Sequence, residues 1–137
     1  MTVNREPKAW AGATGIMQTK LTTEDYMDAF ELADVIAEHS RLDRLYYEFF
    51  RVPALSMGLY VLPEGTADPQ SPHTEDEVYY VVSGSGMVQV DGEDRAVTAG
   101  SIVYVGREAS HRFHSITEDL TLLVVFAPAR PSNPAAG

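Results

Sequence analysis

The feature that most constrains the fold is a series of short apolar runs separated by glycine-rich turns, from about residue 44 to residue 127. There are about eight runs, rich in β-branched and aromatic residues as strands are. Asp91-Gly92, between two of them, is a strong hairpin signal. Short strands at this regular spacing are typical of barrels and sandwiches, so we expect an all-β fold.

One segment has helical spacing, and we expect a helix from residue 22 to about residue 40. Thr22 or Thr23 can cap its first turn. Its apolar positions recur every three or four residues and include Tyr26, Phe30, Ala33 and Ala37. Charged residues lie mostly off this stripe, which predicts a surface helix covering part of the sheet.

The length of 137 residues suits one domain. We assign residues 1–42 to an N-terminal arm and helix packing on the barrel, and residues 43–129 to the barrel. Residues 130–137, with two prolines, are expected to form a flexible tail.

The charge pattern argues against polyanionic partners. The net charge is -10 and the pI about 4.6, whereas nucleic-acid binders usually show a basic footprint. Binding to anionic membranes is disfavoured for the same reason. Because the N-terminus lacks the apolar centre of a signal peptide, the cytoplasm is the expected location.

The strongest candidates for a functional site are His73, Glu77 and His111. There is no cysteine, so a metal must be held by nitrogen and oxygen ligands. On an extended strand, positions 73 and 77 point the same way, and the 38 residues from His73 to His111 allow another strand to return beside the first. Imidazole and carboxylate together are a normal ligand set for Fe, Zn, Mn or Ni.

The surroundings of these residues resemble the two motifs of the cupin superfamily. Gly65, His73, Glu77 and Gly84 match the first motif in spacing, and Gly100 and His111 match the second. The resemblance covers residues 55 to 127. It implies a double-stranded β-helix, or jelly-roll barrel, preceded here by one N-terminal helix. It also implies one divalent metal ion held by His73, Glu77 and His111.

The chain departs from the family pattern at three places. The first histidine of the His-any-His pair is Ser71, the Pro-any-Gly of the second motif is residues 106–108, and the asparagine after the last histidine is Ser115. Two histidines and one carboxylate remain, a set used by both non-haem iron and catalytic zinc sites. Ser71 or Gln70 could add a weak or water-mediated oxygen ligand.

Two further residues are candidates for a catalytic role. Tyr79 shares the strand face of Glu77, although it could simply fill the barrel. His114 lies three residues after His111, so strict alternation turns it away unless a bulge brings it back.

The resemblance implies a metal-dependent enzyme that acts on a small polar or organic-acid-like molecule. Dioxygenase, isomerase and decarboxylase or lyase reactions are all compatible with it, because the fold does not set the reaction. The alternative is a non-catalytic cupin that binds a small molecule. Residues 120–126 are apolar on both strand faces, which predicts a homodimer in which they, residues 45–52 or the N-terminal arm contribute to the interface.

Overall fold

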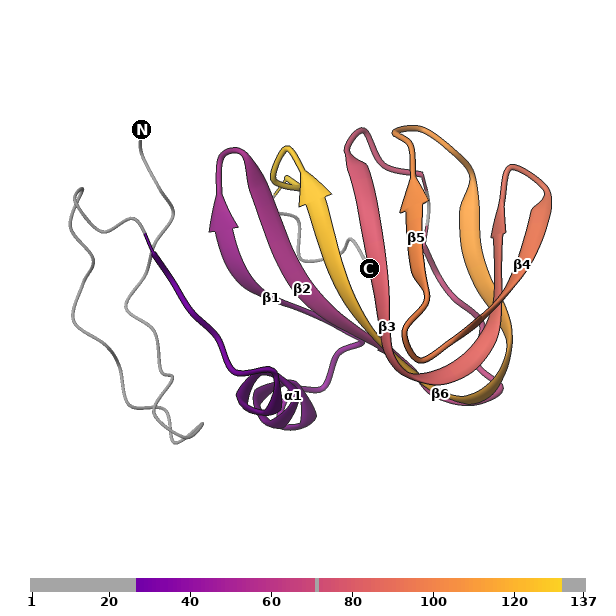
Figure 1. The fold of residues 1–137 in the computed structure, drawn as a ribbon, viewed down its shortest axis with the longest axis horizontal. Helices are drawn as coiled ribbons and strands as arrows, with labels where there is room; N and C mark the ends of the chain where they lie inside the picture. Colours follow the sequence, from indigo (N-terminus) through magenta and orange to yellow (C-terminus); the bar gives the residue numbers. More distant parts are fainter. Residues whose placement is uncertain (1–26, 71, 132–137) are drawn as a thin grey trace.

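A computed structural model describes residues 27–70 and 72–131 (Figure 1). Within these residues the protein has one helix and six strands, which confirms the all-β class. They are α1 (Leu32–Ser40), β1 (Tyr46–Val52), β2 (Leu55–Leu62), β3 (Asp76–Val90), β4 (Glu93–Thr98), β5 (Ile102–Val105) and β6 (His111–Ala127).

The sheet is antiparallel and is organised around a long ribbon made of β3 and β6. The strand order is β1-β2-β6-β3-β4, and β5 also pairs with β3. The ribbon runs from the pair Asp76 and Ala127 to the pair Val90 and His111. Figure 1 shows both strands turning through the base of the molecule, so the ribbon is U-shaped. This bend places the two ends of the ribbon opposite each other.

The bend corrects the predicted number of strands. Of the eight runs in the sequence, those at 78–82 and 87–90 lie in one continuous strand, and so do those at 111–114 and 120–126. The ladder continues through the bend with register shifts, and Gly84 lies there at a φ of +97°. Glycine therefore bends β3 without ending it.

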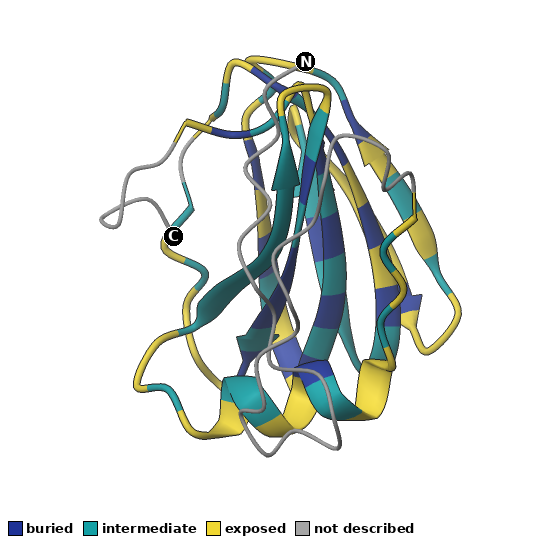
Figure 2. Ribbon diagram, turned by 90° about the vertical axis from the view of Figure 1, so that its left-hand side faces the viewer, coloured by how far each residue is buried: buried dark blue, intermediate teal, exposed yellow. Residues whose placement is uncertain are grey.

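The core lies inside the U. Figure 2 shows buried and more exposed segments alternating along the strands, as expected when one face of each strand points inward. Tyr79, Phe113 and Phe126 are among the largest side chains that the barrel encloses.

The helix begins later than predicted. Residues 27–31 are not helical, α1 starts at Leu32, and the proposed caps Thr22 and Thr23 lie outside the described residues. The ring of Phe30 instead packs edge-on against Phe49 and Phe50, at centroid distances of 5.1 and 5.5 Å. Tertiary aromatic packing thus overrides helical spacing in this stretch. α1 contacts β1 and β2.

No helix among the described residues is both long and apolar enough to cross a membrane.

Arg130, the first residue of the predicted tail, is buried, and its guanidinium lies 5.7 Å from the ring centroid of Tyr46 and 5.1 Å from that of Phe126.

Candidate metal centre

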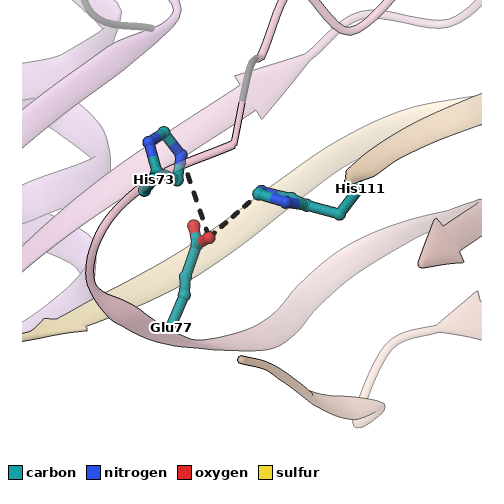
Figure 3. A group of neighbouring side chains, drawn as sticks. All are labelled: His73, Glu77 and His111. Carbon is teal, nitrogen blue, oxygen red and sulfur yellow. Dashed lines mark ion pairs between the residues drawn. The ribbon is translucent and has the colours of Figure 1, made fainter. Parts of the chain in front are cut away.

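The bend of the ribbon brings His73, Glu77 and His111 together. Their ligand atoms all lie within 4.8 Å of one another. His111 Nε2 is 3.2 Å from Glu77 Oε1, and His73 Nε2 is 3.9 Å from the same oxygen. Figure 3 shows both imidazole rings directed at the carboxylate. The prediction that these three side chains gather in one place is confirmed.

Glu77 and His111 are positioned by the backbone ladder. Glu77 lies in β3 between Val105 of β5 and Phe126 of β6, so strands flank it on both sides. His111 is the first residue of β6 and pairs with Val90 at the far end of the ribbon. The two side chains therefore meet across the U.

His73 reaches the group differently from what we predicted. β3 begins only at Asp76, so strand alternation does not bring His73 and Glu77 to one face. His73 lies in the irregular segment before β3, where its carbonyl accepts a hydrogen bond from the backbone N–H of Glu108 at 2.6 Å. Its ring packs edge-on against Phe126 at 5.1 Å.

Burial leaves the polar atoms of this group without ordinary partners. The side chains of Glu77 and His111 are each 1% exposed, and that of His73 is 9% exposed. Among the described residues, neither carboxylate oxygen of Glu77 nor Nε2 of His111 has a hydrogen-bond partner of acceptable geometry. Leaving such atoms unsatisfied costs about 1–3 kcal/mol each, and more for a charged group. A bound cation would satisfy all three, so the residues fit a metal ion.

The tautomer of His111 also suits metal binding. Its Nδ1 lies 2.9 Å from the carbonyl oxygen of Ala109, which can only accept a hydrogen bond. Nδ1 therefore carries the proton, and in the neutral ring Nε2 presents its lone pair to Glu77. A metal-ligating histidine is commonly oriented in this way.

The two histidines differ in their affinity for protons. Burial lowers the pKa of His73, with partial opposition from the Glu77 carboxylate. Burial also acts to lower the pKa of His111, but the Glu77 carboxylate and the Ala109 carbonyl outweigh it and raise that pKa. A metal ion therefore competes with a proton mainly at His111.

Comparison with known proteins gives the family of the chain. The model of the Cupin domain family matches residues 58–126, which include all three candidate ligands. The chain is a cupin. It is 48% identical over 102 residues to Uncharacterized protein SCO3923 of Streptomyces coelicolor, covering 74% of this chain and 97% of that protein.

Solved structures share the barrel of this cupin. An RmlC-like cupin from Shewanella frigidimarina is similar with a TM-score of 0.57 and 25% identity, over 63% of this chain and 77% of that one. The DMSP lyase DddQ from Ruegeria pomeroyi matches with a TM-score of 0.55 and 18% identity, over 66% of this chain and 49% of that one. At 18% identity, the likeness to the lyase shows the fold alone.

The two predicted catalytic residues occupy different places in the cupin. Tyr79 is fully buried, and its hydroxyl donates a hydrogen bond to Gln70 Oε1 at 2.7 Å. Burial, followed by the charge of Glu77, raises the pKa of Tyr79, so the hydroxyl keeps its proton. His114 is not one of the three clustered side chains. Its Nε2 instead lies 2.7 Å from Oδ1 of Asp94 on β4.

Sequence reasoning missed Asp68. Its carboxylate accepts hydrogen bonds from Tyr60 Oη at 2.6 Å, from the backbone N–H of Phe113 at 2.8 Å, and from Gln70 through both backbone N at 3.2 Å and Nε2 at 2.8 Å. This one side chain links β2, β6 and the segment that carries His73. An aspartate in a proline-containing loop gives no signal of this role, because its partners lie up to 45 residues away.

Proposed function

We propose that this cupin binds one divalent metal ion through His73, Glu77 and His111, and that it is a metal-dependent enzyme acting on a small polar or organic-acid-like molecule. The observation that carries the proposal is the buried carboxylate of Glu77, which faces two imidazole nitrogens and has no hydrogen-bond partner among the described residues. Fe, Zn, Mn and Ni all suit two imidazoles and a carboxylate. Such an ion, when bound, supplies Lewis-acid polarisation of a substrate oxygen.

The surroundings of His73 support an acidic substrate. His73 is the least buried of the three ligands, so a small molecule would reach the centre from its side. Burial is the main cause of the lowered pKa of His73, and the positive charge of Arg130 lowers it further. Arg130 and His73 also pack against the same ring, that of Phe126. A carboxylate approaching His73 would therefore be attracted by Arg130.

The reaction type stays open among oxygenation, isomerisation and decarboxylation or elimination. The lyase from Ruegeria pomeroyi carries a barrel of this kind, which supports the view that the fold can host an enzyme. Within this chain, the buried hydroxyl of Tyr79 is not exposed to substrate. We therefore assign it a positioning role through Gln70 rather than direct contact with the reacting molecule.

The test is a substrate screen on protein stripped of metal and reloaded separately with Fe, Zn, Mn or Ni. The panel contains small organic acids and their uncharged analogues, incubated under air and under argon. We expect turnover of an acid that requires one of the metals and is abolished in Glu77→Gln. The matched control Glu93→Gln changes an exposed glutamate of β4 and should retain activity. Metal-dependent binding of an acid without turnover would instead favour a non-catalytic small-molecule-binding cupin.

We also propose that the protein is a homodimer, located in the cytoplasm, and we place its interface on the exposed face of β3 and β5 instead of on residues 45–52 or 120–126. Val78 and Tyr80 of β3 are directly paired with Tyr104 and Ile102 of β5, and all four apolar side chains are exposed on one face of the sheet, Ile102 to 72%. Apolar clusters of this kind often mark an interface.

Light scattering at micromolar concentration tests the assembly. We expect a dimeric mass for the parent protein and a monomeric mass for Ile102→Lys. The variant Glu64→Lys, at an exposed position in the turn after β2, is the control and should remain dimeric. A monomeric parent would contradict the proposal.

A further inference from the structure

The side chain of Gln70 ends beside the candidate metal centre. Its Oε1 lies 3.5 Å from His73 Nε2 and accepts the hydrogen bond from Tyr79. A separation of 3.5 Å is long for a hydrogen bond between the imidazole and the amide. An amide oxygen has two lone pairs, so one remains after the bond from Tyr79.

The orientation of this amide is fixed by its other end. Gln70 Nε2 donates to Asp68 Oδ2 at 2.8 Å, and an ionised carboxylate can only accept. The reverse orientation would put an amide oxygen against that carboxylate and an NH₂ group against the hydroxyl of Tyr79. Asp68 is held in turn by Tyr60 and by the backbone of Phe113. Gln70 Oε1 therefore faces the centre because two strands of the barrel hold its neighbour.

Two interatomic distances in this group match those of atoms that share one ion. Nitrogen and oxygen ligands bound at about 2.0–2.2 Å lie about 2.8–3.6 Å apart at octahedral or tetrahedral angles. The separation of Gln70 Oε1 from His73 Nε2 is 3.5 Å, and that of His111 Nε2 from Glu77 Oε1 is 3.2 Å. The 3.9 Å between His73 Nε2 and Glu77 Oε1 exceeds this range by a few tenths of an ångström.

We infer that Gln70 is the fourth protein ligand of the metal, through Oε1, and that Asp68 and Tyr79 are the residues that position it. The inference rests on the proposed function. It gives the site two nitrogens, one charged oxygen and one neutral oxygen. Replacing an imidazole of the usual cupin set by an amide oxygen makes the site harder, which favours Fe²⁺ or Mn²⁺ over softer ions relative to a three-histidine site.

The test is titration of metal-free protein with Co²⁺, whose visible ligand-field absorption reports both affinity and coordination. Gln70→Leu should weaken Co²⁺ binding by at least about tenfold, the lower end of the effect of changing even an outer-shell partner. It should also alter the absorption spectrum. Gln70→Asn, which keeps the amide but shortens the side chain by one methylene, should also weaken binding and alter the spectrum.

Gln89 offers a matched control. It donates to Asp94 at 3.3 Å in an exposed glutamine–aspartate pair on the outside of the barrel. Gln89→Leu should keep the affinity and spectrum of the parent protein.

The outcomes separate this inference from the proposed function. If Gln70→Leu keeps both the affinity and the spectrum of the parent while His111→Ala loses Co²⁺, Gln70 is not a ligand and the metal site stands. If the parent protein binds no Co²⁺, the proposed function fails and the inference fails with it. If Gln70→Leu fails to fold, as judged by circular dichroism, Gln70→Asn decides, and an unchanged affinity and spectrum there overturn the inference.

Discussion

The candidate metal centre draws its residues from two regions that are held in different ways. Glu77 and His111 belong to β3 and β6, whose backbones are paired with neighbouring strands. His73 and Gln70 belong to the irregular segment between β2 and β3, where the side chain of Asp68 supplies much of the order. One half of the site is built by the sheet, and the other half is built by contacts of the loop, among them four hydrogen bonds to Asp68 and one from Glu108 to the carbonyl of His73.

This difference predicts different consequences of damage. The strand-borne ligands meet because the β3–β6 ribbon bends, so a substitution at the bend should destabilise the whole fold. The loop-borne ligands depend on a local hydrogen-bond network. A substitution at Asp68 should therefore reduce the metal affinity while the barrel still folds. Substitutions at Gly84 and Asp68 can therefore break the two halves separately.

The largest effect is expected at Gly84. A Cβ atom there would lie 2.0 Å from the carbonyl oxygen of Asp119, at a φ of +97° that L side chains rarely adopt. We expect Gly84→Ala to lower the free energy of unfolding by about 3 kcal/mol or more, because backbone strain of about 1–3 kcal/mol adds to the clash with the carbonyl of Asp119. Urea unfolding followed by circular dichroism measures the loss.

Gly100 provides the control for this substitution. Its φ is +95°, nearly that of Gly84, but a Cβ atom there meets nothing within 4 Å. Gly100→Ala should therefore cost only the strain, about 1 kcal/mol. Equal losses in the two variants would mean that the close approach of β3 to Asp119 does not matter.

The strand-borne half of the site is also the half that the sequence predicted best. The resemblance of Glu77, His111 and the glycines around them to the two cupin motifs implied both the barrel and the meeting of these side chains. His73 was predicted correctly for an incorrect reason, since it lies in a loop and not on the strand face of Glu77. The number of strands was wrong because a glycine such as Gly84 gives the same signal whether it ends a strand or bends it.

The loop-borne half could not be predicted because its determinants are long-range contacts. Asp68 accepts from the backbone of Phe113, 45 residues later. The start of α1 also depends on tertiary contacts, because Phe30 packs against Phe49 and Phe50 and is not helical. Local propensity contains no information about such partners.

A smaller effect is expected from Asp68→Asn. Each carboxylate oxygen of Asp68 accepts two hydrogen bonds, and asparagine replaces one of those oxygens with an NH₂ group. Two donors lose their acceptor, so we expect a destabilisation of about 2–3 kcal/mol together with weaker metal binding. Thermal unfolding and Co²⁺ titration measure the two effects.

Asp119→Asn is the control for Asp68→Asn. The carboxylate of Asp119 accepts one exposed backbone hydrogen bond, from Glu64. The substitution should lower the free energy of unfolding by less than about 1 kcal/mol and leave the metal affinity unchanged. Co²⁺ binding at the parent affinity in Asp68→Asn would show that the loop does not depend on this carboxylate.

The smallest effect concerns pH in the metal-free protein. Burial lowers the pKa of His73, so below about pH 6.5 the unfolded chain binds more protons and stability falls as the pH is lowered. The pKa of His111 is raised, burial being outweighed by Glu77 and the Ala109 carbonyl, so above about pH 6.5 its contribution is lost as the pH rises through the raised value. The combined contribution peaks near the ordinary histidine pKa.

Unfolding midpoints measured against pH in the presence of a chelator test this profile. His73→Gln should flatten the acidic limb, and His111→Gln should flatten the alkaline limb. If His111→Gln leaves the alkaline limb in place, another group causes it.

The most direct test of the metal centre is the number of ions that each chain retains. The protein is exposed to excess divalent metal, dialysed, and analysed by elemental mass spectrometry. We expect one ion per chain in the parent protein and in Glu93→Gln, and almost none when His73, Glu77 and His111 are all replaced by alanine, although the barrel still folds. A folded triple variant that retains as much metal as the parent would contradict the assignment of this site.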